Sequence, residues 1–256
     1  MINNIILNML SSVSVNPTDE LKQLLHNVGH PKMNSKQLFD AIVLTLVDNA
    51  KYHPEYLDIA SRLTSLRVYK EVYEAYPDLK HLSVVSDDDD GALNANRKYF
   101  IHPSVIQHNI HDYFEAYLDR VGDNQLCLMS DEFNRKALEY LNLVNLKEIV
   151  SLENDYLLSY IGAKQQYDRY LTRDDKILIE LPQFMWLRVA IGLNLLETDN
   201  FINMVNDVYR TMSNFDYMHS TATLFNAGLK TAQLSSCFKL NIEDDASSIM
   251  EAMSDA

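Results

Sequence analysis

The side chains best suited to chemistry gather in the C-terminal part of the chain. Cys237, which carries a thiol, directly follows Ser236, which carries a hydroxyl. Two further hydroxyl residues, Thr221 and Thr223, stand earlier in the sequence, shortly before Gly228. Short hydroxyls and backbone N–H groups near a glycine can bind phosphate oxygens, and a thiol can donate hydrogen and electrons. Each residue also has a purely structural interpretation, because Ser and Thr commonly form turns and a cysteine in an apolar segment is commonly a small buried side chain.

Carboxylates follow the thiol. The run Glu243, Asp244 and Asp245 stands directly before Ala246 and two serines, which predicts a capped helix with acidic residues at its start. Acidic side chains would repel a phosphate, so at a nucleotide site we expect them to face the nucleoside end of the ligand.

The same segment resembles the large (alpha) subunit of class I ribonucleoside-diphosphate reductase, in its N-terminal portion. Family members carry a stretch close to TLFNAGTxRPQLSSCFLL and then a D-S-[IL]-x-x-I helix opening, and residues 223–228, 233–238 and 244–249 follow that pattern. Residues 160–173 and 181–193 are similar to YFGxKTLxxRYLLK and RPQHMWMRVAxGI, and residues 53–73 to HPDYxxLAARxxxxxLYKEV. The chain departs from these patterns at Leu181, Phe184 and Ala222, where the family has arginine, histidine and proline.

This resemblance implies an oxidoreductase that converts ribonucleoside diphosphates to deoxyribonucleoside diphosphates by radical chemistry, for DNA precursor synthesis. It implies that Cys237 is the substrate-reducing thiol, which works with a second cysteine that the family carries further along its sequence. It further implies that Thr223 and Ser236 contact the diphosphate of the substrate, with Thr221 nearby.

The resemblance also implies regulation and partners. A deoxynucleoside triphosphate or ATP effector is expected at the helix that follows the thiol, with its ribose bound by Asp244, or by Asp245 if the register shifts by one. In the family this helix packs in the homodimer interface. A metal-containing small (beta) subunit supplies the radical, and thioredoxin or glutaredoxin reopens the disulfide, so this chain itself is expected to hold no cofactor and no metal.

Composition limits the other possibilities. The 256 residues are 47% hydrophobic and 23% charged, which is typical of a globular protein, and the formal net charge of −14 argues against nucleic-acid binding. We expect a cytoplasmic protein with no membrane partner, because no stretch has the length of a spanning helix and the N-terminus lacks a signal-peptide pattern. The two cysteines are too few for a disulfide framework or a metal cluster, and Cys127, between two leucines, is predicted to be a buried, inert thiol.

The elements that position these residues are predicted to be mainly helices, since the chain has only six glycines and six prolines. Apolar periodicity and caps predict helices near residues 21–28, 35–49, 55–76, 103–121, 130–140, 160–170 and 199–213. Residues 176–180 are predicted to be a short β segment, and Pro182 to open a helix with a single apolar stripe that contains Met185, Trp186, Val189 and Leu193. We interpret Arg188 on that helix as a paired structural charge rather than a phosphate contact.

Three regions are expected. Residues 1–80 form a helical, degenerate ATP-cone-like region; because the basic V-x-K-R-D-G-R-like hairpin of the cone is missing, regulation of overall activity there should be absent or weak. Residues 81–215 form the helical reductase domain, after a boundary loop at the acidic run 87–91, and residues 216–256 lead into the first strands of the ten-stranded α/β reductase barrel and the effector helix.

The chain lacks the family's radical-forming cysteine, its partner cysteine and the C-terminal shuttle cysteines. We therefore expect it to be inactive alone, as a fragment or as the first half of a split enzyme that assembles with a second polypeptide carrying the rest of the barrel. The alternative is an inactive or severed nucleotide-binding or scaffold module of the same family. Composition alone would indicate only a generic helical interaction protein.

Overall fold

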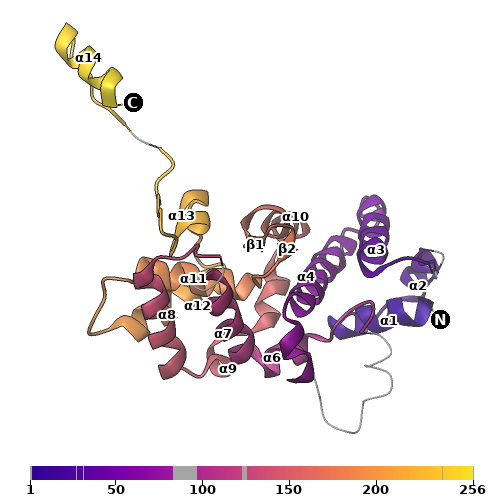
Figure 1. The fold of residues 1–256 in the computed structure, drawn as a ribbon. Coiled ribbons are helices and arrows are strands. Elements are labelled where there is room, and N and C mark those ends of the chain that lie inside the picture. Colours follow the sequence, from indigo (N-terminus) through magenta and orange to yellow (C-terminus); the bar gives the residue numbers. More distant parts are fainter. Residues whose placement is uncertain are drawn as a thin grey trace.

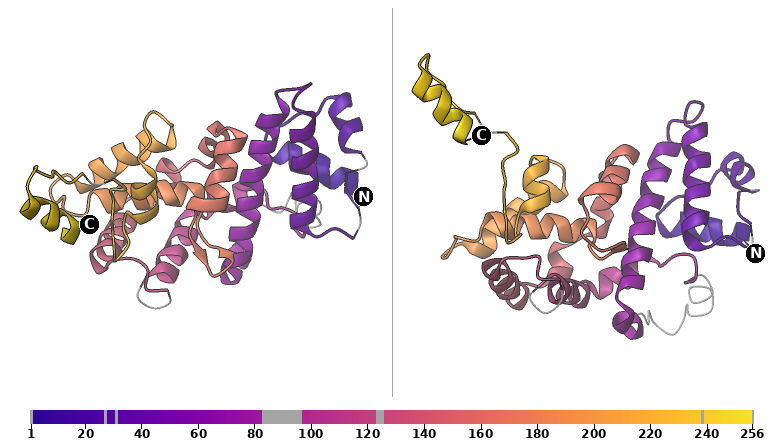
Figure 2. Two further views of the ribbon diagram at one scale, coloured as in Figure 1. Left: turned by 90° about the horizontal axis from the view of Figure 1, so that it is seen from above. Right: turned by 45° about the horizontal axis from the view of Figure 1, so that its top comes forward.

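A computed structural model describes residues 2–26, 28–30, 32–82, 97–122, 126–237 and 239–255. Helices make up most of it, as predicted, and they form an elongated body with the N-terminal helices at one end (Figures 1 and 2). The acidic run at residues 87–91 lies outside the described residues. Among those that are described, none of the helices combines the length and the apolar character that a membrane crossing requires.

Four helices build the N-terminal end: α1 (Ile2–Ser12), α2 (Asp19–Leu25), α3 (Ser35–Asn49) and α4 (Tyr56–Ala75). The last three confirm the predicted segments, whereas α1 was not predicted. A capping box starts α3, because the Asn34 side chain accepts from the Gln37 N–H and the Gln37 side chain accepts from the Asn34 N–H. The helices alone do not test whether this end is a degenerate ATP cone with little or no regulatory activity, so that stays a prediction.

The middle of the chain is a series of short helices. They are η1 (Pro77–Leu82), α6 (Pro103–His108), α7 (Ile110–Val121), α8 (Asp131–Leu143), α9 (Leu146–Ile149), η2 (Leu152–Leu157) and α10 (Tyr160–Gln165), which continues as a π-helical turn, η3 (Gln166–Tyr170). The predicted cap at Ser130 is confirmed, since its side chain accepts from the Phe133 N–H at 3.2 Å.

The C-terminal part contains α11 (Pro182–Leu193), α12 (Phe201–Ser213), α13 (Thr221–Asn226) and α14 (Ala246–Asp255). Pro182 opens α11 as predicted, but the single apolar stripe was too narrow a prediction. All ten residues from Pro182 to Ile191 are buried, because α11 runs through the body and contacts η2, α8, α12 and α13, whereas Leu193 is only half-buried.

Strands are few among the described residues. β1 (Arg173–Asp174) pairs antiparallel with β2 (Ile177–Leu178). β2 lies within the predicted β segment at residues 176–180, whereas β1 precedes that segment and was not predicted. Met129 forms an isolated antiparallel bridge with Leu229. The described residues between 232 and 245 form no strand, so the expected first strands of a barrel are not observed. A strand needs a hydrogen-bonded neighbour, and no described strand lies against this segment.

Candidate functional site

A buried ion pair anchors the helix that leads to the candidate residues. The Arg188 Nε donates to Glu180 Oε1 at 2.8 Å, and both side chains are almost completely buried. Glu180 also accepts from the Tyr117 hydroxyl at 2.7 Å and from the Thr172 N–H and hydroxyl at 2.9 and 2.8 Å. Burial opposes the charged form of Arg188, but the Glu180 charge and the Tyr117 hydroxyl more than offset it, so the pKa of Arg188 lies above its usual value.

The Arg188 guanidinium also binds the C-terminal end of α13 through its two Nη atoms. It donates to three backbone carbonyls there, those of Leu224 at 3.2 Å, Ala227 at 3.1 Å and Phe225 at 3.5 Å. These carbonyls lie at the C-terminal end of a short helix, where backbone acceptors lack helical partners. Arg188 is therefore structural, as predicted, and it fixes α13 on α11.

Two glycines allow the backbones to meet at this point. A Cβ at Gly192 of α11 would lie 2.6 Å from the Gly228 nitrogen, so only glycine permits the observed approach. Gly228 has a φ of +89° and packs against the Phe133 ring. The residues around it pair with the segment before α8, because the Ser130 N–H donates to the Gly228 carbonyl at 2.9 Å and the Lys230 N–H to the Leu128 carbonyl at 3.1 Å.

The predicted hydroxyls differ in their accessibility. Thr223 is buried in α13 and donates to the Leu234 carbonyl at 3.2 Å, while the Asn226 side chain donates to the Gln233 carbonyl at 2.7 Å. These bonds hold residues 233 and 234 against α13. Thr223 thus supports the segment that leads to Cys237 from within the helix.

Thr221 is exposed at the start of α13. Its hydroxyl lies 3.0 Å from the Tyr170 hydroxyl, and the Tyr170 ring stacks on Phe225 with ring centroids 4.7 Å apart and planes 15° apart. Tyr170 ends the π-helical turn η3, so this contact joins α13 to a second part of the chain.

Ser236 and Cys237 are both exposed, and their Oγ and Sγ atoms lie 3.8 Å apart. A cysteine sealed in an apolar interior would have excluded a reaction with a substrate, and the structure does not show that arrangement. The roles of these residues and of the two threonines as substrate contacts stay predictions.

Cys127 is a correction. It was predicted to be buried, but its thiol is exposed and lies 2.7 Å from the Lys230 Nζ. The backbone explains the difference, because Cys127 adopts a left-handed φ of +55° in the turn between α7 and α8, and the core position goes instead to Met129.

The two effector candidates lie at the start of α14, which is separated from the helical body by an extended segment (Figure 1). The Asp245 carboxylate accepts from the Ser247 and Ser248 N–H groups at 2.9 and 3.0 Å, so it caps this helix, as the sequence predicted for the run. Asp244 is exposed. Among the described residues, no hydrogen bond joins either carboxylate to Cys237.

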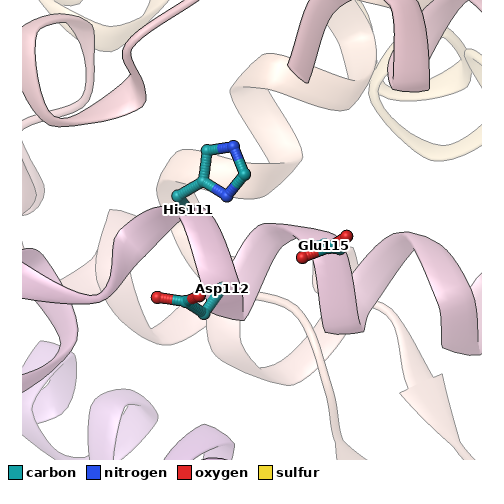
Figure 3. Close-up of side chains that lie close together, drawn as sticks. All are labelled: His111, Asp112 and Glu115. Carbon is teal, nitrogen blue, oxygen red and sulfur yellow. The ribbon is translucent and has the colours of Figure 1, made fainter. Parts of the chain in front are cut away.

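One further group in the described chain has the residue types of a metal site. His111, Asp112 and Glu115 lie on one turn of α7, with potential ligand atoms within 4.8 Å of one another. Figure 3 shows the three side chains along this part of α7; they are half-buried or exposed, and exposed acidic groups are common without a metal ion. We assign no metal site to them.

A groove of about 430 Å³ lies between α3, α4 and α10, far along the chain from Cys237. Its central cation, Arg67, is already matched by Asp40 at 2.6 Å and Glu71 at 2.9 Å, and its Nη2 donates to the Tyr167 hydroxyl. Lys164 on the rim pairs with Asp168 at 2.6 Å. Because most of the charges in this groove are paired with each other, it does not indicate a particular ligand.

Comparison with known proteins shows which family the residues around α13 are similar to. Residues 156–232 match the family described as ribonucleotide reductase, all-alpha domain. Relatives include the ribonucleoside-diphosphate reductase subunit alpha of Chlamydia muridarum, 30% identical over 215 residues, which covers 84% of this chain and 18% of the relative. The large chain of Schizosaccharomyces pombe is 24% identical over 93% of this chain and 24% of its own length, and the large subunit of Acanthamoeba polyphaga mimivirus is 27% identical over 74% and 23%.

The chain is similar to the N-terminal portion of the ribonucleotide reductase large subunit. The family match runs from η2 to just beyond α13, so it contains the Glu180–Arg188 pair, Tyr170 and both threonines. Cys237 lies beyond the matched residues. The chain spans only about a fifth of the length of the curated relatives that it matches.

Two residues within the segment that matches ribonucleotide reductase, Glu180 and Tyr170, were not identified from the sequence. Glu180 could have been found, since a charged residue such as Arg188 inside an apolar helix needs a buried partner and Glu180 stands eight positions earlier. Tyr170 had no such signal, because its place next to Thr221 depends on the π-helical turn.

Proposed function

We propose that the chain is the N-terminal part of a ribonucleoside-diphosphate reductase large subunit and takes part in the reduction of ribonucleoside diphosphates to deoxyribonucleoside diphosphates. The observation that carries this proposal is the exposed Cys237 thiol beside Ser236, on a segment that α13 and the Glu180–Arg188 pair anchor. The names of the matched relatives support the same reaction.

In this proposal Cys237 is one of two thiols that supply the electrons. The ribose 2′ carbon–oxygen bond breaks and the oxygen leaves as water, while the two thiols lose two electrons and two hydrogens and become a disulfide. The second thiol and the radical come from outside the described chain. An external dithiol such as thioredoxin or glutaredoxin then reopens the disulfide by exchange.

The diphosphate is assigned to Thr221, Thr223 and Ser236. The exposure of Thr221 and Ser236 supports direct contact, because a ligand in solvent can reach both residues. The Thr223 hydroxyl donates to Leu234 and is buried, which supports a role in shaping the segment rather than in direct contact.

Partners follow from the same proposal. They are a metal-containing small subunit, a second copy of the large subunit through the effector helix, and a polypeptide that carries the rest of the barrel, all in the cytoplasm. The second candidate function is an inactive or severed nucleotide-binding or scaffold module of the same family.

Replacing Cys237 tests the assigned chemistry. When the chain is mixed with a polypeptide that carries the remaining barrel, a small subunit and a dithiol reductant, we expect CDP reduction, and Cys237→Ser should lower it to background because an alcohol cannot supply these electrons. Cys127→Ser is the matched control, since that thiol is also exposed and should be dispensable. Turnover that survives Cys237→Ser would remove the assignment, and an inactive unaltered mixture would favour the scaffold function.

The effector assignment is tested separately by titrating dTTP into the chain. Removing both candidate carboxylates in Asp244→Ala/Asp245→Ser should raise Kd by at least about tenfold, as expected for lost hydrogen bonds to charged groups. Serine at position 245 keeps a cap for α14, so helix fraying does not confuse the result. Glu251→Ala, elsewhere on α14, should bind like the parent. Equal affinity of the double variant and the parent would contradict the assignment.

A further inference from the structure

The π-helical turn η3 ends at Tyr170, which contacts α13, the helix that bears the candidate phosphate-binding threonines. A π turn holds one residue more than an α turn, so it shifts the direction of the side chains that follow it, and such turns concentrate at functional sites. Here the turn covers Gln166–Tyr170 and closes with the Leu171 N–H donating to the Gln166 carbonyl at 3.2 Å. Tyr170 is its last residue, and it reaches α13.

The Tyr170 ring is held on the face of α13 that bears Thr221. Phe225 stands one helical turn after Thr221, so the two side chains share a face. The Tyr170 ring stacks on Phe225 at 4.7 Å between centroids, and its hydroxyl extends to the Thr221 hydroxyl at 3.0 Å. A stacked ring has little freedom, and the position of its hydroxyl is therefore fixed.

From this contact we infer that Tyr170 is a positioning residue, which orients the Thr221 hydroxyl as a donor to the diphosphate of the substrate. The inference rests on the proposed function and deepens it. A threonine hydroxyl has one hydrogen to donate and two lone pairs that accept. A phenol is a stronger donor than an aliphatic alcohol, so Tyr170 donates to Thr221, and the Thr221 hydrogen is then directed outward.

Such a chain of hydroxyls strengthens its last donor, because each hydrogen bond polarises the next one. The phosphate oxygens of a nucleoside diphosphate accept only, so they need this outward hydrogen. Thr223 does not offer one, since its hydrogen already goes to the Leu234 carbonyl. The two threonines on α13 therefore divide the work, with Thr223 holding the backbone and Thr221 facing the ligand.

The test is a double-variant cycle in the assembled reductase with CDP as substrate. Tyr170→Phe keeps the stacked ring and removes only the hydroxyl, and we expect the KM for CDP to rise about five- to tenfold, the usual effect of one neutral hydrogen bond, with kcat nearly unchanged. Thr221→Val should raise KM at least as much. Tyr170→Phe added to Thr221→Val should change KM no further, because Tyr170 acts through Thr221.

Two controls sharpen the result. Thr221→Ser keeps the hydroxyl and should have a KM close to that of the parent, and Tyr160→Phe removes another tyrosine hydroxyl from the same helical segment and should also match the parent. A parent-like KM in Tyr170→Phe, or additive effects in the double variant, would overturn the positioning role and leave the reductase function standing. If the unaltered assembly does not reduce CDP, the function and this inference fall together.

Discussion

Arg188→Met should lower the free energy of unfolding by about 3–5 kcal/mol, the range expected when one partner of a buried ion pair is removed. Methionine fills a similar volume, so the loss comes from charge and hydrogen bonds rather than from a cavity. Glu180, whose side chain has no exposed surface, would be left without its countercharge, and three carbonyls at the end of α13 would lose their donor. Urea denaturation followed by circular dichroism measures the change.

A second variant separates the charge from the packing. Arg188→Met/Glu180→Gln removes both charges, and the glutamine oxygen can still accept from Thr172, so the double variant should be more stable than Arg188→Met alone. The exposed arginine Arg135 on α8 is the matched control, and Arg135→Met should have little or no effect. If Arg188→Met is as stable as the parent, the anchoring role assigned to Arg188 is wrong.

The second large effect is a dependence of stability on pH that comes from one carboxyl group. Asp155 of η2 is buried against α4 and α11, and this burial raises its pKa from 3.8 to about 7. Hydrogen bonds from Gln183 at 2.5 Å and Tyr69 at 2.8 Å act in the opposite direction. A carboxyl with a higher pKa in the folded chain holds its proton more tightly there than in the unfolded chain. The free energy of unfolding therefore falls as the pH rises from about 4 to about 7, by at most about 4 kcal/mol.

Asp155→Asn should remove most of this slope. The amide can replace the neutral acid, because the Tyr69 hydroxyl can accept from it while donating to the Leu152 carbonyl, 3.0 Å away. We expect a variant that is close to the parent near pH 4 and more stable than the parent at pH 8. Urea denaturation at a series of pH values tests this, with the exposed Asp216→Asn as the control that should keep the parental slope. An unchanged slope in Asp155→Asn would show that another group controls the pH dependence.

Local signals in the sequence predicted most helices correctly, because caps and apolar periodicity act over a few residues. Ser130 and Pro182 mark helix starts that the structure confirms. The helix α1 had a usable signal that was overlooked, since Ile5, Met9 and Leu10 follow a helical period and are buried. The burial of α11 on every side could not be predicted, because it depends on which other helices surround it.

For the candidate site, the residue types in the sequence indicated which side chains could react or bind, but they did not indicate the burial or the contacts of those side chains. The sequence indicated the hydroxyls and Cys237, but not that Thr223 would be buried or that Thr221 would meet Tyr170. The prediction that Cys127 is buried was wrong because of the backbone. Its leucine neighbours suggested burial, but Cys127 adopts a left-handed φ, which a sequence does not reveal at a residue other than glycine or asparagine.

The Glu180–Arg188 pair also constrains how this protein can change over evolutionary time. A mutation at either position alone leaves a buried charge without a counterion, so the two positions can be exchanged only together or through a costly intermediate. Glu180, which lies two residues after β2, and Arg188 in the middle of α11 are therefore expected to vary together rather than singly.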